Sequence, residues 1–428
     1  MNEGIVIFLG CFAGAVLIVA TAGTETGRAL AVRAFFGSGS LVRRAWWWLV
    51  IRVTWKATCR EAGVSKRYTK RKVDRVGVGV ESIEKWKDPR LKTVRTSAHA
   101  VTLKARTRRG QPLKDLETFG ASLAATYDAE VYRVYAPKKR SGSTVLVDLV
   151  KRNLIKKPAI ASMPDPRAVW RSVRLGRTQA GKPWWFQIYD RHTLVIGAAG
   201  SGKGSILWGI LGALAPAISV DLVRAHGIDL KGGVELKMGE RLLTTKAYDV
   251  DAALALLEQL LEIIDDRLEA MAGDVRMFVP TPGSPLHLLI IDELLVLTAF
   301  GSNDTKKRVA ELLGNILARG RAAGVMVVGF AQVGDKASIP MRDHFTQTIA
   351  LRLRSPEQTT MVLGEGMRDL APAHRIARDA QGTAWLIEED GTVDRVRADF
   401  WSDALIRQIA EIYGAEPDAG SALSVVAA

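Results

Sequence analysis

The sequence is poor in cysteine, and its histidines follow no metal-binding pattern. Of the 428 residues only two are cysteine, Cys11 and Cys59, and six are histidine, scattered along the chain. Two cysteines cannot build a disulfide framework or a four-ligand zinc site, so a disulfide-stapled or zinc-stapled domain is excluded. The chain shows no internal repeat, and its 15 prolines are too few for a fibrous or disordered protein. With 48% hydrophobic residues, it is long enough for roughly two to three globular units.

Acidic residues are scarce in the first part of the chain. Residues 1–160 carry 31 Lys and Arg against 12 Asp and Glu, whereas residues 161–428 carry 29 against 33. The net charge of +15 therefore divides into +19 and −4. Within the basic part, residues 43–75 hold eleven basic side chains and two acidic ones. Such a segment is expected to contact anionic cytoplasmic lipid or, alternatively, nucleic acid.

Residues 4–23 lack any charged side chain and are rich in Ile, Val, Leu, Phe and Ala. Because about 20 apolar residues in a helix cross the core of a bilayer, we expect a single transmembrane helix here. A cleaved signal peptide is the alternative, although the charged residue before the run is Glu3 rather than a basic one. Four arginines follow between residues 28 and 44, so the positive-inside rule predicts a membrane protein whose remaining residues are cytoplasmic.

A second apolar stretch, residues 45–51, contains three consecutive tryptophans between Arg44 and Arg52. It is too short to span a membrane by itself, and tryptophan favours the headgroup level of a bilayer. We therefore expect an interfacial segment. On this interpretation residues 1–60 form a membrane anchor, and residues 61–90 form a basic linker.

Residues 91–154 show the alternation of a small α+β domain. One strand is expected over residues 94–103, a helix over residues 113–127, and two further strands over residues 131–135 and 145–149. The order predicts a β-α-β-β module with a basic hairpin tip at residues 137–142.

The rest of the chain predicts a larger α/β domain. A proline-containing connector, residues 155–183, is followed by alternating strands and helices over residues 184–405. This alternation predicts a mostly parallel sheet with helices on its faces. Residues 406–428 are expected to form a C-terminal tail.

A glycine-rich loop follows the apolar run His192–Ile196 and precedes a predicted helix. The pattern matches G-x-x-x-x-G-K, in which backbone N–H groups cradle phosphates and Lys203 reaches the β and γ oxygens of ATP. The eighth position, normally a Ser or Thr that binds Mg²⁺, is Gly204, so we assign that hydroxyl to Ser205. The residues predicted to bind ATP are Gly197, Ala198, Ala199, Gly200, Ser201, Gly202, Lys203, Gly204 and Ser205.

Two carboxylates follow a buried strand about ninety residues later. Asp292 is predicted to hold Mg²⁺ through water, and Glu293 to polarise the water that attacks the γ-phosphate. A further apolar strand, residues 325–330, leads to Gln332, a candidate γ-phosphate sensor. Asp229 and Lys231 follow a third, shorter strand. These strand ends are expected to meet at one edge of the sheet.

Positive charge from a neighbouring subunit can also stabilise phosphoryl transfer. Arg321 is our candidate for such an arginine finger, and Arg319, Arg352 and Arg354 are the other candidates. Each of the four has a solvated surface arginine as its alternative reading.

Taken together, these residues resemble the FtsK/SpoIIIE family of membrane-anchored DNA-pumping ATPases. The resemblance implies a RecA-like P-loop core behind a small domain, assembled as hexameric rings around double-stranded DNA. The Gly-Lys-Gly-Ser form of the loop and residues 361–369 look most like the branch that serves actinomycete conjugative plasmids and integrative elements. The matching pieces are the P-loop and residues 229–235, 266–271, 291–293 and 321–332.

Departures from the family pattern shape the functional expectation. Chromosome-partitioning members end in a module that reads orientation sequences, whereas only about 28 residues follow Phe400 here. The resemblance therefore favours conjugative transfer over chromosome segregation, with phosphate contacts and little sequence preference. Two alternatives stay open: a protein-export ATPase of the same superfamily, and a nucleotide-binding membrane scaffold that does not hydrolyse ATP.

Overall fold

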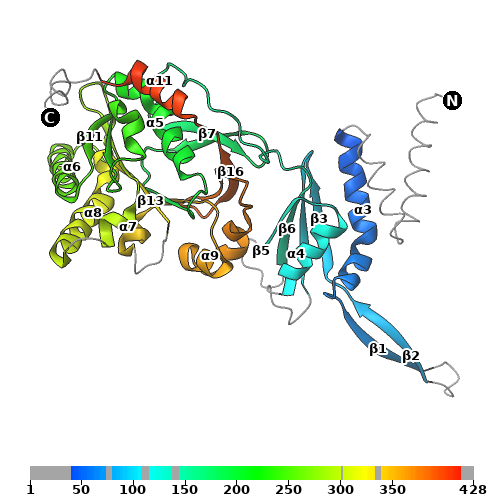
Figure 1. Ribbon diagram of the computed structural model, residues 1–428. Helices are drawn as coiled ribbons and strands as arrows, with labels where there is room; N and C mark the ends of the chain where they lie inside the picture. The colour runs from blue at the N-terminus through cyan, green and yellow to red at the C-terminus, as the bar shows by residue number, and fades with distance from the viewer. Residues whose placement is uncertain are drawn as a thin grey trace, which may run out of the picture. The chain divides into compact units, whose positions relative to one another are not determined.

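The computed structural model describes residues 40–73, 80–107, 115–136, 144–299, 302–332 and 339–415 (Figure 1). The chain divides into two units, residues 1–154 and residues 155–428. The expected membrane-spanning segment, residues 4–23, lies outside the described residues, as does the expected hairpin tip, residues 137–142. Among the residues that are described, no helix is both long and apolar enough to span a membrane.

The first unit contains a four-stranded antiparallel sheet in the order β3-β4-β6-β5. The sequence predicted one strand before the helix, but Ser97 breaks it into two, since its hydroxyl accepts the amide of Ala100 at 2.9 Å. The module is therefore β-β-α-β-β rather than β-α-β-β. The elements of the unit are α3 (Ser40–Glu61), β1 (Lys66–Val73), β2 (Val80–Lys87), β3 (Arg90–Thr96), β4 (Ala100–Arg106), α4 (Asp115–Thr126), β5 (Val131–Tyr135) and β6 (Thr144–Val150).

The tryptophan-rich stretch belongs to helix α3 and packs in the core of this unit. Trp47 contacts Tyr127 edge to face, and Trp55 contacts Phe119 in the same way. Ile51, between them on the helix, is fully buried. Trp48, by contrast, is 43% exposed, with the Arg52 guanidinium over its ring. Residues 45–51 are thus part of a longer helix that packs Trp47 and Ile51 against protein, and an interfacial role for the segment stays a prediction.

The expected basic linker, residues 61–90, also has regular structure. Strands β1 and β2 pair antiparallel over eight positions, from Lys66 opposite Lys87 to Val73 opposite Val80. Near its base the ribbon exposes Tyr68 and Trp86, and Arg67 pairs with Glu84 at 3.1 Å. The charged residues therefore lie on a two-stranded ribbon.

The second unit contains a ten-stranded sheet in the order β11-β10-β12-β13-β9-β14-β15-β16-β7-β8. The strands from β11 to β14 are parallel, and those from β15 to β8 are antiparallel to their neighbours. The sheet strands are β7 (Ser172–Thr178), β8 (Pro183–Gln187), β9 (Thr193–Ile196), β10 (Val223–Ile228), β11 (Leu243–Ala247), β12 (Leu286–Ile291), β13 (Val325–Ala331), β14 (Gln347–Ala350), β15 (Thr383–Ile387) and β16 (Val393–Ala398).

Helices cover both faces of this sheet (Figure 1). Every residue of β9, β12 and β13 is buried, as expected for parallel strands covered on both sides. The first core includes α5 and α11, and the second includes α6, α7 and α8. The helices of the unit are α5 (Lys203–Ser219), α6 (Val250–Met271), α7 (Leu294–Ala299), α8 (Asn303–Ala323), α9 (Pro356–Leu363), α10 (Met367–Leu370) and α11 (Asp403–Tyr413), with short 3₁₀ turns η1 (Leu236–Leu242), η2 (Pro340–His344) and η3 (Ala373–Arg375).

The boundaries of this unit differ from the expected ones at both ends. The expected connector contains β7, and its first residue, Ile155, is 1% exposed. The buried Arg397 donates to the Ile155 carbonyl at 3.0 Å and also bonds the Lys156 carbonyl, which joins this segment to β16. At the other end the expected tail begins inside helix α11, which buries Ile406 and Ile409. The second unit therefore begins earlier and ends later than the sequence indicated.

Candidate nucleotide-binding site

The glycine-rich loop lies between β9 and α5, at the carboxyl edge of the parallel strands. Three backbone hydrogen bonds to neighbouring segments hold the loop. Gly197 N–H donates to the Ala331 carbonyl at 3.1 Å, and Ala198 N–H donates to the Arg352 carbonyl at 2.9 Å. Gly382 N–H donates to the Ser201 carbonyl at 2.9 Å. The first amides of α5 have no partner inside the helix, and with the helix dipole they favour an anion. The loop is therefore formed in a geometry suited to phosphate.

Glycine is required at position 202. Its φ is +100°, a left-handed conformation that other residues rarely adopt. A β-carbon there would also collide with the backbone of Gly382. The Ser201 hydroxyl beside it is buried and has no hydrogen-bond partner among the described residues. The loop thus offers an available hydroxyl for a ligand group.

Lys203 folds back over the loop. Its Nζ donates to the Gly197 carbonyl at 2.8 Å and lies 3.4 Å from the Ala198 carbonyl. Burial lowers the pKa of Lys203, while Glu293 acts in the opposite direction. The ammonium group is positioned to exchange these carbonyls for phosphate oxygens.

The two predicted carboxylates follow β12 and lie beside the loop. Glu293 is 7% exposed, and its Oε1 accepts the amide of Gln332, at the end of β13, at 3.2 Å. Lys231 Nζ, which follows β10, lies 3.2 Å from Glu293 Oε2 and 3.5 Å from Asp292 Oδ2. The structure therefore brings together Lys203, Asp292, Glu293 and Gln332, as the sequence predicted.

Lys231 offsets the charge of the carboxylate pair. Burial raises the pKa of Asp292, although Lys231 counteracts part of this effect. For Lys231 itself, burial opposes the charged form, but Glu293 and Asp292 outweigh burial and raise its pKa. The Lys231 ammonium group, which follows β10, is thus shared by the two carboxylates that follow β12.

Asp229 organises the loop that carries Lys231. Its carboxylate is almost completely buried. Oδ1 accepts the amide of Lys231 at 3.1 Å, and Oδ2 accepts the amides of Glu235 and Leu236 at 3.1 and 3.3 Å. These three bonds fold residues 229–236 back toward the P-loop.

Glu235 lies directly against Gly204. Its Oε1 accepts the Trp208 indole N–H at 3.0 Å. A β-carbon at position 204 would be 2.7 Å from the same oxygen. Burial raises the pKa of Glu235, and the charge of Asp292 adds to this effect.

Ser205 does not join the carboxylates. It lies one residue further along α5, turned by roughly 100° around the helix from Gly204. Among the described residues, no hydrogen bond connects its hydroxyl with Asp292, Glu293 or Glu235. The assignment of the missing P-loop hydroxyl to Ser205 therefore receives no support from the geometry.

The residues present fit ATP with Mg²⁺. Within the described parts of the chain, no group of three or more His, Cys, Asp and Glu side chains could hold a metal ion. Mg²⁺ commonly uses one or two carboxylates together with substrate phosphates. Asp292 supplies one such carboxylate, and Lys203 with the loop amides supplies the phosphate contacts.

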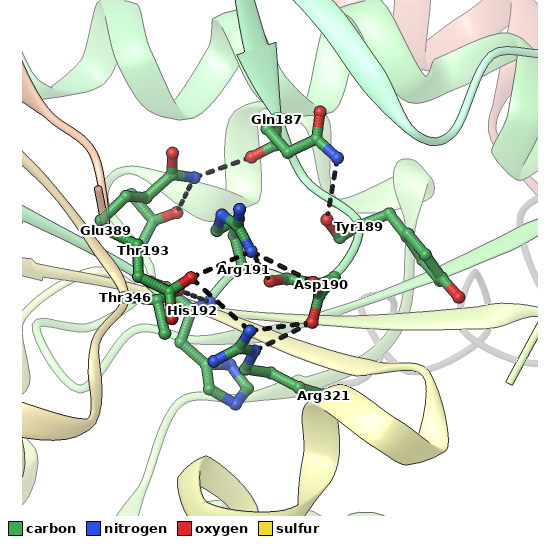
Figure 2. A network of polar contacts seen from close by, with 10 residues as sticks. Gln187, Tyr189, Asp190, Arg191, His192, Thr193, Arg321, Thr346 and Glu389 are labelled. Carbon is green, nitrogen blue, oxygen red and sulfur yellow. Dashed lines mark hydrogen bonds and ion pairs between the residues drawn. The ribbon is translucent and has the colours of Figure 1, made fainter. Parts of the chain in front are cut away.

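Arg321 lies far from this site in its own chain. It ends α8, which leads into the start of β13, whereas the P-loop follows the end of the parallel strand β9. Figure 2 shows its guanidinium against Asp190, with which it forms a 3.0 Å ion pair, and near Glu389 at 3.7 Å. The structure therefore places Arg321 at the amino edge of the sheet, and a role at a neighbouring subunit's site stays a prediction.

The other candidate arginines differ in their surroundings. Arg319 pairs with Asp265 at 2.6 Å on the helical surface, and Arg354 is exposed. Arg352 follows β14, and its guanidinium donates to the Ala199 carbonyl in the P-loop at 3.1 Å. Of the four candidates, Arg352 is the one that touches the loop in its own chain.

Sequence reasoning missed three contributors to the site. The sequence marks Lys231 as a strand-end residue and Glu235 as part of a segment that matches the family, and it gives no signal for Gly382. The position of Lys231 directly after a short strand was a usable signal. The other two meet the P-loop through non-local folding, which no local pattern reveals.

A curated protein is similar to about half of the chain. The ESX secretion system protein EccC of Thermomonospora curvata is 27% identical over 238 residues, which are 48% of this chain and 17% of EccC. The chain thus matches less than a fifth of that relative.

Solved structures show a related fold. The monomer form of the pCW3 conjugation coupling protein TcpA with ATPγS superposes with a TM-score of 0.52 at 17% identity, covering 76% of this chain and 94% of that one. The cytoplasmic domain of the T. curvata type VII secretion ATPase EccC has a TM-score of 0.47 at 22% identity, covering 59% and 33%. The FtsK/SpoIIIE family model matches residues 169–384, which are half of the chain and run from β7 to the start of β15, and so the chain belongs to the FtsK/SpoIIIE family.

Proposed function

We propose that this protein is an ATP-driven translocase of double-stranded DNA. In this proposal it is a single-pass protein of the cytoplasmic membrane, works as a homo-oligomeric, hexameric ring, and serves intercellular transfer of DNA by conjugation. The observation that supports ATP hydrolysis best is the convergence of Lys203, Asp292, Glu293 and Gln332 on the edge where the P-loop opens.

Each of these residues has a chemical task in phosphoryl transfer, which depends mainly on positioning and charge stabilisation. Lys203 and the α5 amides bind and orient the phosphates. Glu293, nearly buried and fixed by Gln332 and Lys231, accepts a proton from the attacking water. When bound, Mg²⁺ neutralises phosphate charge, and Asp292 would hold it.

Two observations support DNA as the cargo. The first 160 residues carry a net charge of +19, suited to a polyanion. TcpA, similar in fold, is described as a conjugation coupling protein. The similarity to EccC supports a second candidate, a protein-export ATPase, because EccC is a secretion system protein.

The test is the ATPase rate of the full-length protein with and without linear double-stranded DNA, at low and moderate salt. A translocase should be stimulated by duplex DNA, and added salt should weaken this stimulation because phosphate contacts release counterions. Lys203→Ala provides the background control.

Other outcomes point elsewhere. Steady turnover that ignores DNA would favour the protein-export function. ATP binding without turnover would favour a nucleotide-binding scaffold. A separate test of location is whether the protein stays in the membrane fraction after high-salt and carbonate washes.

A further inference from the structure

The P-loop of this chain lacks a side chain where a magnesium-binding hydroxyl usually stands. Position 204 is glycine, and the Glu235 carboxylate occupies the space toward which a side chain at this position would point. A β-carbon on residue 204 would lie 2.7 Å from Glu235 Oε1 and 3.8 Å from Oε2. A carboxylate oxygen from another strand end therefore lies beside the place where a hydroxyl-bearing side chain would begin.

Glu235 is fixed in this place from two sides. Its backbone amide donates to the buried Asp229 carboxylate at 3.1 Å. Its Oε1 accepts from Trp208 Nε1 at 3.0 Å, and Trp208 stands one helical turn after Gly204 on α5. These contacts restrict the carboxylate to the rim of the P-loop and leave Oε2 without a partner among the described residues.

The surroundings of Glu235 suit a shared cation. The charge of Asp292 acts on Glu235, and the charges of both Glu235 and Asp292 act on Lys203. Two carboxylates from the ends of β10 and β12 thus approach the same part of the loop. With phosphate oxygens they make the oxygen set that Mg²⁺ prefers, whereas alone they repel each other.

We infer that Glu235 replaces the P-loop hydroxyl and, together with Asp292, would supply a protein oxygen to the Mg²⁺ that accompanies ATP. This inference rests on the proposed function, because it requires ATP at the P-loop. It explains why glycine stands at position 204, since any larger residue would push the Glu235 carboxylate aside.

The decisive variant is Glu235→Gln, which keeps an oxygen that accepts from Trp208 but removes the negative charge. Binding of a fluorescent non-hydrolysable ATP analogue to the full-length protein is measured in EDTA and over a Mg²⁺ titration. We expect the Mg²⁺ concentration at half-maximal effect to rise about 10–100-fold. Affinity in EDTA should be unchanged or increase, because a charge that repels phosphate is gone.

A matched control is Glu240→Gln. Glu240 lies in the adjoining turn η1, where it accepts from Tyr248 at 3.0 Å and lies 3.7 Å from Lys246. This variant removes the same charge from the same segment without touching the P-loop. Its Mg²⁺ dependence should equal that of the unaltered protein.

A second variant, Gly204→Ser, tests replacement of one ligand by the other. The serine restores a hydroxyl and displaces the carboxylate, so adding Glu235→Gln to Gly204→Ser should change the Mg²⁺ midpoint far less than Glu235→Gln does alone. Equal shifts in both backgrounds would show that the carboxylate and the hydroxyl do not share a role, and would overturn the inference.

The failures of the two proposals are distinguishable. If the analogue binds and Glu235→Gln leaves the Mg²⁺ midpoint unchanged, the inference is wrong and ATP binding stands. If the unaltered protein binds no analogue with or without Mg²⁺, while retaining its folded circular dichroism spectrum, the proposed function fails and the inference fails with it.

Discussion

The amide of Gln332 donates a 3.2 Å hydrogen bond to Glu293 Oε1. The bond joins the ends of the neighbouring strands β12 and β13, so the expected γ-phosphate sensor and the expected base are one connected unit. A ligand that moves the Gln332 backbone also changes the position of the Glu293 carboxylate. This gives the two residues a physical reason to respond to nucleotide together.

Glu293→Gln should therefore separate binding from hydrolysis. The amide keeps an oxygen for the Gln332 N–H but cannot accept the proton of the attacking water. We expect ATP to remain bound while turnover falls by about 10²–10⁴-fold. Single-turnover hydrolysis and filter binding of labelled ATP measure the two effects, and loss of both together would contradict the assignment.

Lys231 should matter for turnover more than for binding. Lys231→Ala leaves Asp292 and Glu293 without their shared cation, so the carboxylates repel each other and the phosphates. We expect turnover to fall by about 10²-fold. Lys231→Arg, which keeps the charge, should recover part of this loss. Equal turnover in all three proteins would contradict this role for Lys231.

Asp229 is expected to act on stability as well as on activity. Asp229→Ala removes the acceptor of three amides, and each buried donor left without a partner costs about 1–3 kcal/mol. Urea unfolding followed by tryptophan fluorescence should show a clear loss of stability. Asp274→Ala, at an exposed position, is the control and should change little.

Arg352 and Arg321 should give different results. Arg352 contacts the P-loop, so Arg352→Ala should lower ATP turnover by about tenfold, equivalent to about 1.4 kcal/mol. Arg321→Ala breaks a partly exposed ion pair with Asp190 and should cost about 0–1 kcal/mol of stability, with turnover retained.

Loss of turnover in Arg321→Ala with normal ATP binding would instead support a finger that acts on a neighbouring subunit. Asp190→Asn distinguishes the cases. It removes the same ion pair without removing the arginine, so a purely structural role predicts the same effect for both variants.

Three buried histidines should make the second unit sensitive to acid. Burial lowers the pKa of His192 and His287 to about 3 and that of His226 to about 4. The unfolded chain protonates these rings near their usual pKa of about 6.5, so below that value it binds more protons than the folded protein. The free energy of unfolding should therefore decrease as the pH falls from about 6.5 to about 4, by up to about 1.4 kcal/mol per pH unit for each ring.

Urea unfolding at pH 7.5, 6.0 and 5.0 measures this slope. His192→Asn keeps a side-chain acceptor for the Val327 amide, which His192 Nδ1 binds at 3.0 Å, but does not titrate. Its slope should be shallower than that of the unaltered protein. Identical slopes would show that His192 does not contribute.

The site was predictable from the sequence where chemistry follows local order. Asp292, Glu293 and Gln332 each follow an apolar run, Lys203 closes the glycine-rich loop that follows another, and parallel strands bring such ends together. Glu235 was not predictable in this way. Its approach to Gly204 depends on the fold of residues 229–236, which the buried Asp229 holds through hydrogen bonds to three amides, and no local sequence pattern places that segment beside the P-loop.

The fold was predictable where apolar runs are continuous and less so elsewhere. An apolar helix with tryptophans has the same pattern at a membrane surface and in a protein core, so residues 45–51 could not be assigned by composition. The ribbon of β1 and β2 lacks the apolar alternation of a half-buried strand, because both of its faces carry charge. Helix α11 did carry a signal, since the Ser402 hydroxyl caps it by accepting the Leu405 amide at 3.3 Å.

Arg397 links the candidate nucleotide site to the first residue of the second unit through hydrogen bonds. The Nε of Arg397 donates to the Gln381 carbonyl at 2.9 Å, and the amide of the next residue, Gly382, donates to the Ser201 carbonyl in the P-loop. A second guanidinium nitrogen of Arg397 donates to the carbonyl of Ile155, where the second unit begins. Three hydrogen bonds therefore form a continuous path between the first residue of the second unit and the phosphate loop.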